Sequence, residues 1–334
     1  MKNKVDTSRR KTPWDDSKHL SSTQRFIKKK YETNYKNKHP KLSKTNEANL
    51  INSVIVNKCP YCDSSHFKKY GKTSNEIQRF YCQECNKTFT AITSTIFDNH
   101  KIAITEWVEF CLDILNYSST SLLSKVNKNA INTSIYWLHK LFVILRNYQK
   151  DIILDKDVYI DETFYSIVYR KRQQNDGKFL RGLSKDKFCI GIGCNNKYTI
   201  AILEGMGKPS EASTKAAFLE HIKAGSTLIH DDEKSHKVLV KELCLSNISY
   251  KSKNLKNLDD NDNPLNPINR KCDLLKKFLY SHSGFSRDDL QDYLNLFCFI
   301  VNGPHNKLKK VEILLDKALN TKITLKYRDL YKKK

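Results

Sequence analysis

The chain has 334 residues, of which 59 are Lys or Arg and 36 are Asp or Glu, so its formal net charge is +23. This excess favours a polyanionic partner, and nucleic acid is preferred over a membrane because no segment approaches the roughly 20 apolar residues of a span. The first residues, MKNKVDTSRRK, lack the apolar stretch of a secretion signal, so we expect a cytoplasmic, nucleoid-associated protein.

Residues 1–50 are rich in Lys, Asn and Ser and show little periodicity. This composition is typical of a basic, largely disordered arm, and an arm that becomes ordered on DNA is the alternative. Both interpretations predict electrostatic contacts that weaken as salt is added.

Ten cysteines in a reducing compartment do not form a disulfide framework, so their spacing must be explained otherwise. Four of them make two C-x2-C pairs separated by nineteen residues: Cys59, Cys62, Cys82 and Cys85. This spacing matches a structural, tetrahedral zinc site, and we predict a zinc ribbon over residues 51–98. The other six sit singly among apolar residues and are assigned to the core: Cys111, Cys189, Cys194, Cys244, Cys272 and Cys298.

Residues 99–150 have helical periodicity. Apolar residues recur at helical spacing from Trp107 to Ile114 and from Ile135 to Leu145, and SSTSLLSKV between them begins with capping residues. Three helices with a short second member fit a helix-turn-helix DNA-binding domain, although most small helical bundles bind no DNA.

Residues 151–303 begin with β-rich runs. The predicted elements are strands at 158–169, 187–195 and 197–204, a helix at 213–225, a strand at 226–230, a strand at 247–252, and helices at 268–279 and 288–302. This order predicts an α/β domain of the ribonuclease H-like fold, in which helices flank a mixed five-stranded sheet. Residues 304–334 are expected to form a basic tail that, like the stretch 169–187, follows the DNA backbone, or is simply solvated.

Asp161 lies within the first strand, in the run VYIDET. Val158 and Ile160 point to one face of that strand, Asp161 and Thr163 to the other, and Glu162 away from Asp161. Asp is disfavoured in strands, and such local conflicts are expected at functional sites.

A second acidic position follows the strand that ends at 230, in LIHDDEKSH. If the first and fourth strands are neighbours, Asp161 and an acid here can share Mg²⁺ or Mn²⁺, which prefer carboxylate oxygens. Asp231, Asp232 and Glu233 are all candidates, and Asp231, the first acid after the strand, is preferred. His230 and His236 are then neighbours of the site that could contact DNA.

Metal sites of this kind usually add a Glu from a later helix, but the chain has no Glu between Glu242 and Glu312. Beside the apolar stripe of helix 268–279 lie Asn269, Asp273 and Lys276. Asn269 could offer its amide oxygen to the metal, Lys276 could hold a phosphate, and Asp273 is the competing ligand.

VYIDET, LIHDDEKSH and NPINRKCDLLKKFL followed by HSGFSRDDLQDYLNLFCF resemble the transposase domain of bacterial insertion-sequence elements of the Asp-Asp-Asn-Lys type, in the DDE superfamily. The resemblance covers about residues 55–303. It implies Asp161, Asp231 and Asn269 as the magnesium-binding catalytic triad and Lys276 as the following Lys. It also implies DNA transposition on terminal inverted repeats by a homo-oligomer bound to DNA. The long polar segment 251–264 departs from the pattern.

Two other functions share these residues. One is an inactive, transposase-derived zinc-ribbon regulator that only binds DNA, against which the intact Asp161 and Asp231 argue. The other is a metal-dependent nuclease without strand transfer, which would use the same metal ligands.

Overall fold

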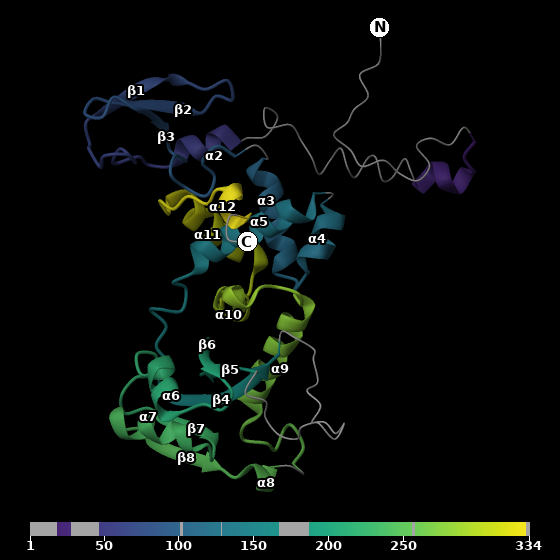
Figure 1. Ribbon diagram of the computed structural model, residues 1–334, viewed down its shortest axis with the longest axis vertical. Coiled ribbons are helices and arrows are strands. Elements are labelled where there is room, and N and C mark those ends of the chain that lie inside the picture. The colour runs from purple at the N-terminus through teal and green to yellow at the C-terminus, as the bar shows by residue number, and fades with distance from the viewer. Residues whose placement is uncertain are drawn as a thin grey trace, which may run out of the picture. The chain divides into compact units, whose positions relative to one another are not determined.

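The computed structural model describes residues 19–27, 47–100, 103–127, 129–166, 187–255 and 258–331 (Figure 1). The chain divides into two compact units, Met1–Val143 with Lys307–Lys334, and Ile144–Asn306. Most of the N-terminal arm and nearly all of the basic stretch 169–187 lie outside the described residues. Within the described ranges, no helix combines the length and apolar character that a membrane span needs.

The first unit opens with one helix and three strands: α2 (Glu47–Ser53), β1 (Phe67–Lys72), β2 (Gln78–Cys82) and β3 (Thr88–Thr90). The strands form an antiparallel sheet in the order β1-β2-β3. The rings of Phe67, Phe80 and Phe89 pack together at centroid distances of 5.5 to 5.6 Å. This aromatic cluster, joined by Cys59 and Cys82, is the small core of the ribbon.

Three helices follow, as the periodicity predicted: α3 (Ile104–Ile114), α4 (Thr120–Val126) and α5 (Ile131–Leu145). Trp107 and Phe110 of α3 are buried. The hydroxyl of Ser119 caps α4 by accepting a hydrogen bond from the backbone N–H of Leu122.

The C-terminal residues of the chain also belong to the first unit, where the expected basic tail contains two helices, α11 (Lys307–Asn320) and α12 (Tyr327–Tyr331). The apolar face of α11 is buried at Val311, Leu314 and Ala318. These residues recur at helical spacing, so this Lys-rich segment forms an ordinary amphipathic helix with its lysines mainly on the other face.

The second unit contains a five-stranded sheet: β4 (Asp157–Tyr165), β5 (Phe188–Cys194), β6 (Thr199–Met206), β7 (Thr227–Asp231) and β8 (Ser246–Tyr250). The strand order is β6-β5-β4-β7-β8. β5 is antiparallel to both of its neighbours, whereas β4, β7 and β8 are parallel. The predicted ribonuclease H-like fold is therefore confirmed, including the adjacency of the first and fourth strands.

Helices cover both faces of this sheet: α6 (Glu211–Phe218), α7 (Lys237–Glu242), α9 (Asn266–Ser281) and α10 (Leu290–Val301), with the short α8 (Ser252–Leu255) between β8 and α9. Val158 and Ile160 of β4 point into the core that contains Phe218 of α6 and Leu239 of α7. Asp161 points to the opposite face, where the side chain of Cys272 on α9 contacts it.

Candidate metal centres

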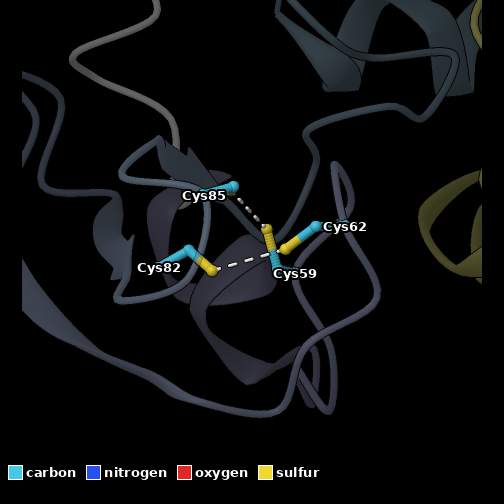
Figure 2. Close-up of side chains that lie close together, drawn as sticks. All are labelled: Cys59, Cys62, Cys82 and Cys85. Atoms are coloured by element: carbon cyan, nitrogen blue, oxygen red, sulfur yellow. Dashed lines mark hydrogen bonds between the residues drawn. The ribbon is translucent and has the colours of Figure 1, made fainter.

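The four cysteines of the ribbon point toward one another (Figure 2). The Sγ atoms of Cys59 and Cys85 lie 3.7 Å apart, and those of Cys62 and Cys82 lie 3.6 Å apart. A tetrahedral Zn²⁺ with Zn–S bonds of about 2.3 Å requires sulfur separations of about 3.8 Å. The spacing of the cluster therefore fits a zinc ion.

The two C-x2-C pairs have the same backbone geometry. In each pair the N–H of the first cysteine donates to the carbonyl five residues later, from Cys59 to Ser64 at 2.8 Å and from Cys82 to Lys87 at 3.0 Å. The residue after the second cysteine is left-handed in both, with φ of 58° at Asp63 and 56° at Asn86. Asp and Asn tolerate this conformation better than most residues, so both tight turns are favoured by sequence.

The backbone of the second turn also favours the deprotonated form of Cys82. N–H groups of Cys85 and Glu84 donate toward the sulfur of Cys82 and lower its pKa to about 7. A deprotonated sulfur is the form that binds metal. Cys82 therefore gives up its proton to a metal more readily than an ordinary thiol does.

The second candidate centre lies where β4 and β7 run side by side. Ile160 pairs with His230 in the parallel register, so Asp161 and Asp231 are the next residues of each strand. One carboxylate oxygen each from Asp161, Asp231 and Glu162 lie within 4.8 Å of one another. The sequence placed Glu162 on the other face, and the structure nevertheless brings one of its oxygens to this group.

Crowding and burial make this group of acids receptive to a cation. Burial, followed by the charges of Glu162 and Asp231, raises the pKa of Asp161 to about 6. Burial also raises the pKa of Asp231. A divalent cation bound between Asp161 and Asp231 would lower both pKa values, because its positive charge offsets negative charges that are shielded from water.

On α9 the side chain that contacts Asp161 is Cys272, whose Sγ lies 3.7 Å from Asp161 Oδ2. Burial raises the pKa of Cys272, and the charge of Asp161 raises it further, so the thiol is protonated and donates to the carboxylate. Cys272 is buried, as its place in an apolar stripe predicted, but it also touches the candidate site. A Cys in an apolar stripe gives no sequence signal for this second role. Cys244, which was likewise predicted to lie in the core, is exposed.

The other α9 candidates flank Cys272. Asn269 is half-buried and lies one turn before it. Lys276 lies one turn after it, and its Nζ is 3.8 Å from Asp273 Oδ1. The side chain of Asp273 is 67% exposed. Asp273, the competing ligand, therefore lies at the surface of α9 and pairs with Lys276.

A buried chain of hydrogen bonds lies behind the carboxylates. His236 Nε2 is 2.7 Å from Glu162 Oε1, and His236 Nδ1 is 2.8 Å from His230 Nδ1. His230 Nε2 is in turn 2.8 Å from Asn247 Oδ1. Burial opposes a charge on His236, but the hydrogen bond and charge of Glu162 outweigh it and raise the pKa of His236.

These contacts correct the expectation that His230 and His236 could contact DNA. His230 is 3% exposed and His236 is fully buried, so neither ring can reach a partner on the surface. The sequence could not reveal this, because the turn after Asp231 folds His236 back under the sheet. Asp232, by contrast, is exposed, as expected of a solvated neighbour.

Gly191 of β5 makes room for this buried chain. It pairs with Glu162 in the register, and a Cβ at this position would lie 2.2 Å from Glu204 Oε1 and 2.7 Å from the ring of Phe218. Burial and the charge of Glu162 raise the pKa of Glu204 to about 7. A second acid thus approaches Glu162 from β6 only because residue 191 has no side chain.

No protein-family model matches the chain. Among solved structures, it is 12% identical to the Mos1 mariner paired end complex with Mn, covering 63% of this chain and 75% of that one, with a TM-score of 0.29. It is 9% identical to a simian T-cell lymphotropic virus intasome, covering 58% of this chain and 68% of that one, with a TM-score of 0.30. TM-scores this low carry no argument about the fold, which is assigned here from the strand order.

In sequence, the chain is 22% identical over 251 residues to an uncharacterized protein in transposable element ISH50 of Halobacterium salinarum, a match that covers 72% of this chain and 83% of that protein.

Proposed function

We propose that the chain is the transposase of an insertion sequence, which cleaves the ends of its element and joins them to target DNA. The observation that supports this most directly is the meeting of Asp161 and Asp231 on adjacent strands of a ribonuclease H-like sheet. The similarity to a protein of transposable element ISH50 supports the same conclusion. The net charge of +23 suits a DNA substrate.

Asp161, Asp231 and Asn269 are the residues that would hold Mg²⁺ or Mn²⁺. When bound, the cation supplies activation of the attacking hydroxyl and stabilisation of the charge on the phosphodiester. Asp161 and Asp231 are positioned for this by the parallel pairing of their strands. Asn269 adds an oxygen from α9, and Lys276 holds a DNA phosphate near the carboxylates.

Cys272 has a different role from Asn269 in this proposal. A thiol is a soft ligand that Mg²⁺ binds poorly, so an oxygen donor on α9 is still required. The thiol of Cys272 donates to Asp161 Oδ2 while Oδ1 accepts from the N–H of Glu162, and together these two contacts fix the orientation of the carboxylate that would hold the cation. Cys272 is therefore a positioning residue.

The zinc ribbon and the three helices after it would bind the inverted repeats at the element ends. The spacing of the four sulfurs supports a structural zinc ion, and α3 to α5 have the lengths of a helix-turn-helix unit with a short second helix. Two element ends must be held together for joining, so the active species would be a homo-oligomer on DNA.

The test uses purified protein, Mn²⁺ and DNA that carries the inverted repeats flanking its gene. We expect cleavage and joining by the unsubstituted chain, and loss of both in Asp161→Asn and Asp231→Asn with DNA binding retained. Binding without cleavage by the unsubstituted chain would favour the regulator, and cleavage without joining would favour the nuclease.

The α9 assignment has its own test. Asn269→Ala should abolish joining, whereas Asp273→Ala should leave it within about twofold, because an exposed helix pair contributes little. The opposite result, with Asp273→Ala inactive and Asn269→Ala active, would transfer the ligand role to Asp273.

A further inference from the structure

The first unit contains a cavity of about 820 Å³, and its lining includes no residue of either metal centre. Its walls are the turn around Phe97, Trp107 of α3, one face of α5, and residues 324–328. The α5 face presents Thr133, Tyr136, Trp137 and Lys140, which are spaced i, i+3, i+4 and i+7. Cavities that bind small molecules commonly have volumes of about 300 to 1,000 Å³.

Lys140 is a buried cation on the wall of this cavity, with only 5% of its surface exposed. Its Nζ lies 4.7 Å from the ring centroid of Tyr136 and 5.6 Å from that of Phe97. Within the described ranges, no carboxylate forms an ion pair with Lys140 and no group hydrogen-bonds its Nζ. A buried ammonium without a counter-charge is costly, and an anion entering the cavity would relieve that cost.

The charges around the cavity also favour an anion. Lys326 and Arg328 line it together with Lys140, and Asp98 is the carboxylate on its wall. Asp98 is already engaged, because its Oδ2 accepts a hydrogen bond from the N–H of Ser94 at 3.2 Å. The cations therefore outnumber the carboxylate.

Aromatic rings make up much of the remaining wall. Phe97 and Trp107 meet edge to face at 5.2 Å, and Tyr136 and Tyr327 do so at 5.5 Å. The indole N–H of Trp107 is buried and has no hydrogen-bond partner among the described residues. Walls built from aromatic rings suit a planar ring such as a nucleobase, which can stack on them.

We propose that this cavity binds an unpaired nucleotide of a DNA strand, with its base against the aromatic rings and its phosphate at Lys140. A base inside a duplex is shielded on both faces, so the ligand must be single-stranded or turned out of the helix. The proposal is independent of the chemistry at Asp161 and Asp231, since it concerns binding by the other unit of the chain.

Tryptophan fluorescence provides the test. Trp107 and Trp137 line the cavity, and the remaining tryptophan, Trp14, can be removed by W14F in the full-length chain. We expect a short oligothymidylate to quench this fluorescence, and the same strand annealed to its complement to quench it much less. Lys140→Met should weaken single-strand binding about tenfold or more, the effect of losing one charge-assisted contact, and Lys140→Arg should restore most of it.

Lys125→Met is the matched control, because it removes an equal charge from an exposed position on α4. It should weaken single-strand and duplex binding alike and by less than Lys140→Met. Equal quenching by strand and duplex, or unchanged single-strand binding in Lys140→Met, would overturn the proposal. Binding of inorganic phosphate or thymidine monophosphate as tightly as the oligomer would also overturn it, since the site would then serve a small anion.

Discussion

Replacing Lys140 by Met should stabilise the first unit while weakening its binding of single strands. Burial lowers the pKa of Lys140 from 10.5 to about 8. At about 1.4 kcal/mol for each tenfold change in ionisation, this corresponds to about 3 kcal/mol of lost stability at neutral pH. Cation–π contacts with the rings of Phe97 and Tyr136 offset about 1 to 2 kcal/mol of this lost stability. The net gain expected for Lys140→Met is therefore about 1 to 2 kcal/mol.

The stability that Lys140→Met gains over the parent chain should decrease as the pH rises. Lys140 is protonated in the unfolded chain up to its ordinary pKa of 10.5, but in the folded chain only up to about 8. The penalty is thus complete below about pH 8 and is relieved as the pH rises toward 10.5. Lys140→Met removes the titrating group, so the advantage of the variant should shrink over this interval.

The assay is urea unfolding of the full-length chain in the W14F background. Trp107 and Trp137 are both buried in the first unit, so their fluorescence reports its unfolding and not that of the second unit. A variant less stable than the parent at pH 7, or a stability difference that stays constant up to pH 10.5, would refute the reasoning. In that case Lys140 would have to be paired in a way that the described residues do not show.

Four further outcomes are expected. In metal analysis after growth with zinc, Cys62→Ser should hold less zinc than the unsubstituted chain, since three thiolates and a hydroxyl bind Zn²⁺ more weakly than four thiolates. Cys272→Leu should lower the cleavage rate about tenfold and Cys272→Ser much less, because only Ser can still donate to Asp161; equal rates would deny Cys272 its positioning role. His236→Ala should cost about 3 kcal/mol in chemical unfolding, because Glu162 would be left buried and unpaired. Stabilisation by added Mn²⁺ in thermal unfolding should decline as the pH falls through about 6, where protons compete for Asp161.

Much of the fold could be predicted from sequence because local patterns determine it. The spacing of Cys59, Cys62, Cys82 and Cys85 predicted sulfurs that the structure brings together. The order of strands and helices predicted the sheet, and its topology then placed Asp161 beside Asp231. These inferences required only spacing, periodicity and the adjacency of the first and fourth strands.

Other features depend on tertiary contacts that no local pattern encodes. Cys272 occupies an apolar stripe, and only the packing of α9 on β4 shows that its sulfur reaches Asp161. The alternation of β4 suggested that Glu162 points away from the site, but alternation describes a regular strand and not its long side chains. Lys140 did carry a signal, since it follows Trp137 at helical spacing on the buried face of α5.

The buried histidines bear on metal affinity because they join β7 to β4 on the face opposite α9. Asp161 faces α9, while Glu162, the next residue, accepts from His236 on the opposite side. His236 also bonds His230, which immediately precedes Asp231. The end of β7, which carries Asp231, is thus tied to β4 through His236, and we expect the separation of the two carboxylates to depend on this buried contact. Losing His236 should therefore weaken Mn²⁺ binding as well as stability, whereas an ion pair with a structural role alone would lower stability and leave the affinity of the folded protein unchanged.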